Sequence, residues 1–323
     1  MKKGLSLVAL LVLSFTMGTM FVYLIVDGYG RSYFSLSLLL VFVVLWLINM
    51  ATKFKEVDKS EVDFKVKESI FSFLAILIPT LIVYLATTYL ELDNIIIVGF
   101  VSFLGVIFFK DLAAAITIGA FLGMSLFQEA GYYGLIVAVL IAFLLESLSK
   151  ELFKGYGGKL GTISFTAGLL TFYLFKIPFH YSAGYQGLTI LYVFIISIVA
   201  SLTTYLLNNK FNLGPIMAYS VVSMFGALIF LPFGFASEFA FSSIIFGASF
   251  IGMTSQERFK NILSPLLAAI IFAFLIVISQ HLHGIGGRSG TTALISVLII
   301  EVIIYFFEWL KPEKSKLGLS NNK

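Results

Sequence analysis

The first residues that could do chemistry belong to a short glycine-rich element with a basic side chain, which occurs twice. Gly-x-Gly-Gly-Lys-x-Gly-Thr begins at Gly155, and Gly-x-Gly-Gly-Arg-x-Gly-Thr begins at Gly284. Glycine lets a backbone approach a ligand closely, and a helix start offers unpaired N–H groups with a partial positive charge. With a basic side chain added, each element is a candidate anion or carboxylate site. The alternative is a tight turn before a helix, capped by its threonine. The candidate residues are Gly157, Gly158, Lys159, Thr162, Gly286, Gly287, Arg288 and Thr291.

Two glutamates are candidates for a pair of gates. Topology places Glu129 at the level of Arg288 on one side of the membrane, and Glu257 at the level of Lys159 on the other. We therefore consider two acid–base contacts, one closing each side of a pathway. The alternative is four unrelated surface charges, because exposed ion pairs are common and weak.

Glu301 lies within a run of aliphatic residues, Leu-Ile-Ile-Glu-Val-Ile at 298–303. An ionisable group at that depth in a membrane costs a few kcal/mol, about 2.5 or more, and marks a functional site by default. It could relay protons or bind a cation. It could equally be a neutral, hydrogen-bonded structural acid.

Enzyme chemistry has little support in the sequence. The chain has no cysteine, which excludes thiol nucleophiles and thiolate metal sites. His281 and His283 are too sparse for a metal site without a visible third ligand. We predict no catalytic residue, no cofactor and no metal, and we do not expect an enzyme.

Composition assigns the chain to the membrane. It is 59% hydrophobic and 12% charged, and its mean hydropathy is +1.03. A spanning helix needs roughly 20 apolar residues. We expect an all-α polytopic membrane protein with about twelve spans, at 5–26, 34–50, 69–90, 95–109, 112–127, 133–149, 162–178, 187–207, 214–231, 239–254, 262–280 and 292–309. The segment 95–127 could instead be a re-entrant pair.

The distribution of basic residues predicts the orientation. With twelve crossings and both termini in the cytoplasm, only Arg31, Lys176 and Arg288 of the 21 basic residues lie outside. Cytoplasmic loops characteristically carry this excess of Lys and Arg. We therefore expect a multi-pass protein of the inner cell membrane with cytoplasmic termini.

An internal repeat organises the chain. The sequence Thr-Thr-Tyr-Leu at 87–90 recurs at 203–206, and the segments 101–105, 119–125 and 155–162 recur in the same order at 222–226, 247–254 and 284–291. This divides the chain into an N-terminal hairpin (1–50), a cytoplasmic linker (51–68), repeat A (69–180), repeat B (186–310) and a cytoplasmic tail (311–323). Five helices in each repeat require the second copy to have inverted topology. Small residues that let helices pack closely in the repeat core are expected at Gly119, Gly123, Gly247 and Gly252.

Inverted repeats are characteristic of transporters whose site lies between the two copies near the membrane midplane. We expect a secondary carrier for a small polar solute or ion. A channel or facilitated-diffusion pore is the nearest alternative, and an intramembrane enzyme or a subunit of a membrane complex is the next. The expected partners are the lipid bilayer, a small polar or anionic solute and a possible second copy of the chain, with no nucleic acid.

Overall fold

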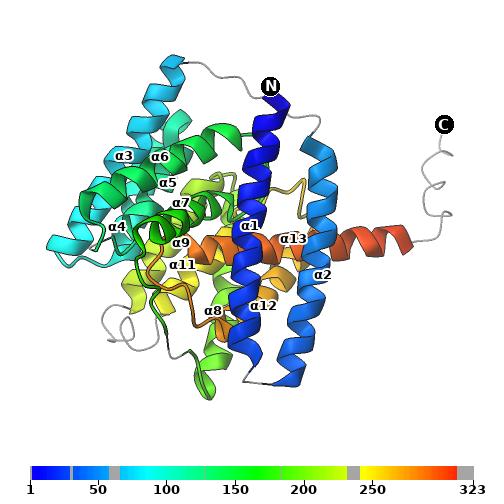
Figure 1. Ribbon diagram of the computed structural model, residues 1–323. Coiled ribbons are helices and arrows are strands. Elements are labelled where there is room, and N and C mark those ends of the chain that lie inside the picture. The colour runs from blue at the N-terminus through cyan, green and yellow to red at the C-terminus, as the bar shows by residue number, and fades with distance from the viewer. Residues whose placement is uncertain are drawn as a thin grey trace.

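The computed structural model describes residues 2–29, 32–57, 66–127, 129–182, 184–230 and 241–310, and this part of the chain is all-helical, without a β-strand. Each of the twelve expected segments corresponds to one α-helix (Figure 1). The helices are α1 (Lys2–Tyr29), α2 (Tyr33–Glu56), α3 (Val66–Tyr89), α4 (Asn94–Phe108), α5 (Ala113–Gly123), α6 (Gly131–Leu148), α7 (Lys159–Phe175), α8 (Leu188–Tyr205), α9 (Pro215–Phe230), α11 (Phe241–Gly252), α12 (Leu263–Ile278) and α13 (Arg288–Leu310).

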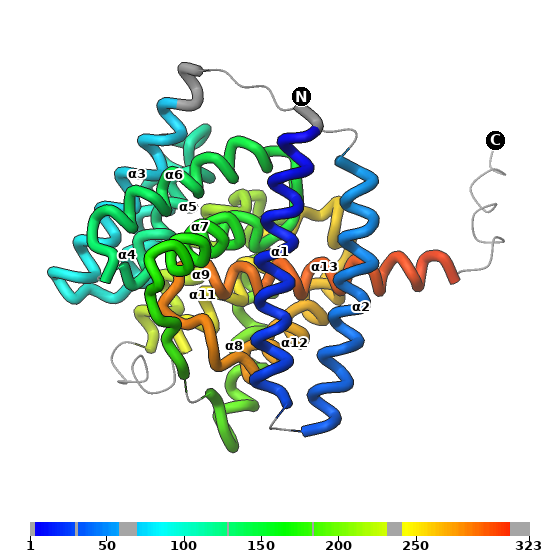
Figure 2. The backbone as a smooth tube through the Cα atoms, in the orientation of Figure 1, coloured from blue at the N-terminus to red at the C-terminus, as the bar shows by residue number. Residues whose placement is uncertain are grey.

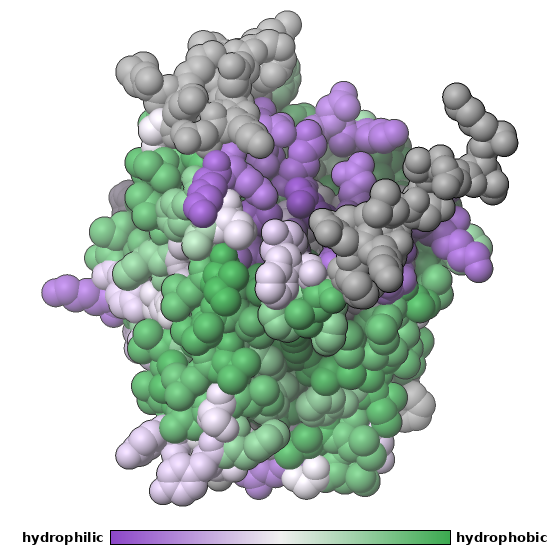
Figure 3. All heavy atoms as spheres, turned by 90° about the vertical axis from the view of Figure 1, so that its right-hand side faces the viewer, coloured by the Kyte–Doolittle hydropathy of each residue, from purple (hydrophilic) through white to green (hydrophobic). Residues whose placement is uncertain are grey.

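The length and hydropathy of these helices fit a membrane-embedded protein. Six described helices are long and apolar enough to cross a membrane, namely α1, α2, α3, α6, α8 and α13. Hydrophobic residues cover the middle of the face seen in Figure 3, and hydrophilic residues gather at its upper end. This distribution leaves a band of apolar surface of the kind that lipid would cover.

α5 and α11 are the two shortest of the described α-helices. α5 has 11 residues and α11 has 12, so each is only about 17–18 Å long, against a hydrocarbon core of about 30 Å in a bilayer. The segment 95–127 thus consists of α4 and the much shorter α5, joined by a single 3₁₀ turn at Lys110–Leu112.

Several helix ends follow from local chemistry. The side chain of Asp93 precedes α4 and accepts hydrogen bonds from the backbone N–H groups of Ile95 (2.9 Å) and Ile96 (3.0 Å), as an N-cap does. Pro215 is the first residue of α9, where its missing N–H costs nothing. α2 continues to Glu56, six residues beyond the expected end at 50, so Lys53 belongs to a helix rather than to the linker.

Close helix packing builds the core. α3 packs on α5, α8 on α11, α4 on α9, and α7 on α13. A Cβ at Gly119 or Gly123 would overlap a backbone carbonyl of α3, and one at Gly252 would overlap a carbonyl of α8. At Gly247 a Cβ would meet the ring of Phe272. Gly119, Gly123 and Gly252 therefore lie where two helix backbones approach each other, whereas Gly247 packs against side chains.

The hairpin of α1 and α2 lies along one side of this core. Figure 2 shows that α1 starts at the end of the molecule where α2 finishes. α13 runs across the hairpin and packs on α2 (Figure 1). One end of the hairpin therefore carries the start of α1 and the end of α2, and the other carries the turn between them.

Candidate functional site

The two glycine-rich elements form turns of the same backbone shape. We call residues 155–159 the first turn and residues 284–288 the second turn. Gly155 and Gly158 have φ values of +80° and +89°, and Gly284 and Gly287 have +85° and +87°. Glycine is the residue that adopts this left-handed region without strain. The turns lead directly into α7 at Lys159 and α13 at Arg288.

Each turn is fastened just after a short helix in the other half of the chain. The N–H of Gly157 donates to Thr254 Oγ1 (3.1 Å), and the N–H of Gly286 donates to Ser125 Oγ (2.9 Å). The carbonyl oxygen of Gly155 accepts from the N–H of Ser255 (2.9 Å), and that of Gly284 accepts from the N–H of Leu126 (2.8 Å). The first turn thus holds the end of α11, and the second turn holds the end of α5.

The turns also pack on each other where α7 and α13 begin. Gly161 and Gly290 are in direct backbone contact, and a Cβ on either would lie under 3.0 Å from the other residue. A Cβ at Gly157 would overlap the carbonyl oxygen of Phe250, and a Cβ at Gly286 would overlap that of Phe121. Every one of these positions excludes a side chain, so glycine is required for the two helix starts to cross.

The basic residues of the two turns differ in their surroundings. The Lys159 ammonium donates to the carbonyl oxygens of Ser149 (2.6 Å) and Lys150 (2.8 Å). Arg288 is 8% exposed, and its Nη2 donates to the carbonyl oxygen (3.4 Å) and the hydroxyl of Ser279. Its Nε–H is buried without an acceptor, and no described carboxylate lies within ion-pair distance of it. Arg288 is therefore a buried cation whose charge is not balanced by a direct partner.

A cavity of about 330 Å³ opens beside Arg288. It lies at the end of the molecule that carries the turn between α1 and α2, because Asp27 near the end of α1 accepts from the N–H groups of Gln280 and His281. Its polar lining includes Asn94, Ser182, Tyr185, Ser243, Ser279, His283, Arg288 and Ser289. Of the described residues, Arg288 is the one Lys, Arg, Asp or Glu in this lining. We call this cavity the Arg288 pocket.

Two loop residues of the Arg288 pocket are neutral near pH 7. Burial, and next the neighbouring Arg288 cation, lower the pKa of His283 to about 3. Burial raises the pKa of Tyr185 to about 12. The phenol therefore remains a hydrogen-bond donor, and Arg288 carries the only full charge among the described lining residues.

Acid should destabilise the protein through His283. The unfolded chain protonates this histidine below about pH 6.5, whereas the folded protein does so only near pH 3. Above about pH 6.5 this difference costs no stability. As the pH falls below that value the free energy of unfolding decreases, and the loss reaches about 1–3 kcal/mol at pH 4.5. Thermal melts at pH 7.5 and 4.5 should show a smaller acid loss for His283→Gln than for the wild type. The exposed His180 supplies the control, His180→Gln, and an unchanged loss in His283→Gln would contradict the expectation.

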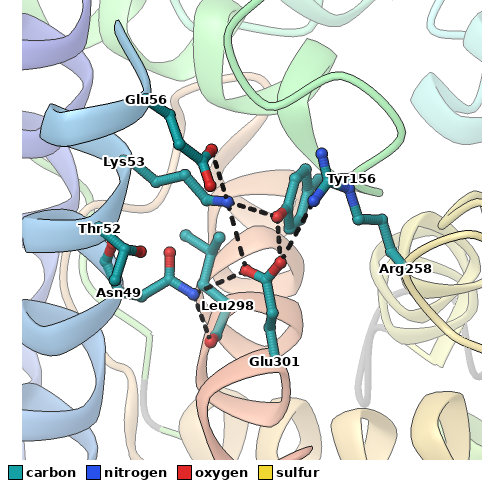
Figure 4. A network of polar contacts seen from close by, with 8 residues as sticks. All are labelled: Asn49, Thr52, Lys53, Glu56, Tyr156, Arg258, Leu298 and Glu301. Carbon is teal, nitrogen blue, oxygen red and sulfur yellow. Dashed lines mark hydrogen bonds and ion pairs between the residues drawn. The ribbon is translucent and has the colours of Figure 1, made fainter. Parts of the chain in front are cut away.

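Glu301 lies in a second polar cluster, which includes Lys53 and Glu56 from the last turn of α2 (Figure 4). Its carboxylate accepts from Asn49 Nδ2 (2.8 Å) and from the Tyr156 hydroxyl. Lys53 Nζ lies 3.6 Å from Oε2, and Arg258 Nη1 lies 3.5 Å from Oε1. Glu301 is therefore held by two cations and two neutral donors, which fits a structural acid better than a free proton relay.

Tyr156 is the centre of this cluster. Its hydroxyl accepts from Lys53 Nζ (2.6 Å), and its ring lies between Lys53 and Arg258, 4.8 and 4.4 Å from their charged groups. Burial, and next the negative charge of Glu301, raise the pKa of Tyr156 far above its ordinary value. A neighbouring cavity of about 360 Å³ is lined by Lys53, Glu56, Glu151, Lys154 and Arg258 among others.

Some predicted contacts are not formed in this conformation. Glu129 and Glu257 are exposed, and no described ion pair joins them to Arg288 or Lys159. The threonines do not cap the helices either. Thr162 and Thr291 lie in the first turns of α7 and α13, and their hydroxyls donate back to the carbonyls of Gly158 and Gly287.

Sequence reasoning missed the partners of both clusters. Lys53 was assigned to the solvated linker, although it is buried beside Tyr156. Asp27 is buried at the end of α1, where it accepts from the His281 ring as well as from the backbone. One available signal was its position, since an acid at the edge of an apolar span requires donors.

Comparison with known proteins adds no relative to this description. No protein-family model, curated protein or solved structure matches the chain. Its function is therefore inferred from its own geometry.

Proposed function

We propose that this chain is a secondary transporter for a small polar solute or ion, built from two inverted five-helix repeats. In this proposal residues 69–180 and 186–310 are the repeats, and both termini are cytoplasmic. The Arg288 pocket then faces outward, and the cluster around Glu301 lies toward the cytoplasm. The solute passes between the repeats, along the crossing of α7 and α13.

The reciprocal fastening of the two turns is the observation that carries this proposal. Gly157 packs on the carbonyl of Phe250 and Gly286 on that of Phe121. The first turn bonds just after α11, and the second turn bonds just after α5. Helix pairings also correspond, since α3 on α5 matches α8 on α11, and α6 on α7 matches α12 on α13. An exchange of this kind supports a two-fold relation between the halves, which fits inverted repeats.

A difference between the two basic residues supports alternating access. Arg288 lines a polar cavity, whereas the Lys159 ammonium is tied to two carbonyl oxygens and lines neither of the two polar cavities described above. Phe246 lines the inner side of the Arg288 pocket and packs against Phe121 and Phe250, which are fully buried. We take this conformation as open to the outside, with the aromatic rings closing the pathway below the pocket.

The cluster around Glu301 would then be the cytoplasmic closure. It joins four parts of the chain, namely α2 of the hairpin (Lys53), the first turn (Tyr156), the loop after α11 (Arg258) and α13 (Glu301). Opening toward the cytoplasm would require Tyr156, which belongs to the first half, to separate from Lys53, Arg258 and Glu301.

A flux experiment tests the proposal. The full chain, reconstituted in liposomes, is screened with acetate, chloride, nitrate, glycine, urea, glycerol, sodium and potassium. We expect saturable uptake of at least one solute, accelerated when the same solute is loaded inside, because a carrier returns faster when occupied. Flux that never saturates would identify a pore, and no flux above empty liposomes for any solute would overturn the transport proposal.

A further inference from the structure

The Arg288 pocket has the composition of an anion site. Among the residues that the structure describes, its lining contains one full positive charge and no Asp or Glu. Hydroxyl and amide groups of Asn94, Ser243 and Tyr185 supply further donors around the same cavity. A cation would meet only repulsion from Arg288 here, because no described carboxylate in the lining offsets it.

The nearest acid is already committed elsewhere. Asp27 is buried and accepts from the N–H groups of Gln280 (2.6 Å) and His281 (3.2 Å), and from the His281 ring. These three donors occupy lone pairs of the Asp27 carboxylate. Asp27 therefore holds the loop between α12 and the second turn, rather than pairing with Arg288. A buried cation without a direct counter-charge is costly, and a bound anion would remove that cost.

The geometry of the guanidinium narrows the ligand class. Nε–H has no acceptor, and the Ser279 contacts occupy Nη2 alone. A guanidinium presents parallel donors that match the two oxygens of a carboxylate. A cavity of about 330 Å³ lies at the small end of ligand pockets, which run from about 300 Å³. The start of α13 at Arg288 also offers unpaired backbone N–H groups to an anion.

We infer that the Arg288 pocket binds a small monovalent carboxylate, and that the solute carried by this chain is therefore anionic. The first half of this inference concerns binding alone, and the second half depends on the proposed transport function. Binding and flux must accordingly be measured separately.

Matched solutes give the binding test. Acetate and acetamide have nearly the same shape and differ in charge, and methylammonium carries the opposite charge. Thermal unfolding of the purified full chain is followed against each solute, at constant ionic strength, with a bulky sulfonate as the only other anion. Acetate should raise the midpoint saturably, whereas acetamide and methylammonium should not.

Variants locate the effect. Arg288→Gln should weaken acetate binding by roughly tenfold or more, since charge-assisted hydrogen bonds contribute about that much, and Arg288→Lys should restore part of it. Lys176→Gln is the matched control, because it removes one exposed positive charge outside the pocket. Wild-type acetate binding can be judged against acetamide even if Arg288→Gln fails to fold.

Each outcome separates the two proposals. Equal stabilisation by acetamide, or acetate binding that survives in Arg288→Gln, would overturn the carboxylate site. Acetate binding without acetate flux would support the carboxylate site and contradict the inference that the transported solute is anionic. Saturable flux of a neutral solute with no acetate binding would overturn the site while supporting the transporter.

Discussion

Alanine in place of Gly157 or Gly286 should prevent the protein from folding to its normal stability. At either position a Cβ would overlap a backbone carbonyl oxygen of the opposite half, at a separation well under 3.0 Å. The backbone cannot rotate away as a side chain can, so the first turn must move off α11 in Gly157→Ala, and the second turn must move off α5 in Gly286→Ala. We expect a loss of about 3 kcal/mol or more and a melting midpoint lowered by roughly 6–12 °C.

Gly18→Ala is the matched control for this comparison. Gly18 lies within α1, and a Cβ there would meet only the Trp46 ring, at the ordinary contact distance of 3.6 Å. Alanine favours a helix over glycine by about 1 kcal/mol, so this variant should be as stable as the wild type or slightly more. If Gly157→Ala and Gly18→Ala had equal melting midpoints, the contact of Gly157 with the Phe250 carbonyl would not be as close as described.

Glu301→Gln should be the most destabilising change of a charged residue. Lys53 has a side chain only 8% exposed, and the substitution leaves it with Glu56, whose side chain is 58% exposed, as its remaining carboxylate. Breaking a buried pair on one side typically costs about 3–5 kcal/mol. Glu301 is itself 26% exposed, so we expect about 2–4 kcal/mol, measured by thermal or denaturant unfolding.

A double-mutant cycle and a second ion pair on α13 control this result. Lys53→Met combined with Glu301→Gln should recover much of the loss, because no buried charge then lacks a partner. Glu308→Gln breaks the Lys260–Glu308 pair, which at 3.0 Å is closer than the ion pairs of Glu301 but has side chains 69% and 48% exposed. Exposed pairs contribute about 1 kcal/mol or less. A loss as large for Glu308→Gln as for Glu301→Gln would contradict the role of burial.

The apolar runs predicted the helices well because lipid-facing and core-facing helices are both hydrophobic. All twelve segments are helical over the part of the chain that the structure describes. The ends were less accurate where polar residues belong to a helix. Lys53 and Glu56 continue α2, and Lys159 starts α7 rather than a loop, because their side chains find buried partners that only the tertiary structure supplies.

Only part of the candidate sites could be predicted from the sequence, again because tertiary contacts supply the partners. The glycine pattern identified both turns, since close backbone approach leaves a clear trace in sequence. Arg288 and Lys159 have the same place in the pattern, but their different surroundings depend on Ser279, Ser149 and the shape of the nearby cavity. Nothing in local sequence links Asn49, Tyr156 and Arg258 to Glu301, because these contacts join distant segments.

The N-terminal hairpin is attached mainly to the second half of the chain, and this has a mechanical consequence. Asp27 bonds to the segment between α12 and α13, and Asn49 donates to both Glu301 and the carbonyl of Leu298 on α13. The hairpin is therefore pinned to that half near both of its ends. If the halves rock against each other, α1 and α2 should travel with α12 and α13 as a single rigid lever. The first half would then be the part that slides along it.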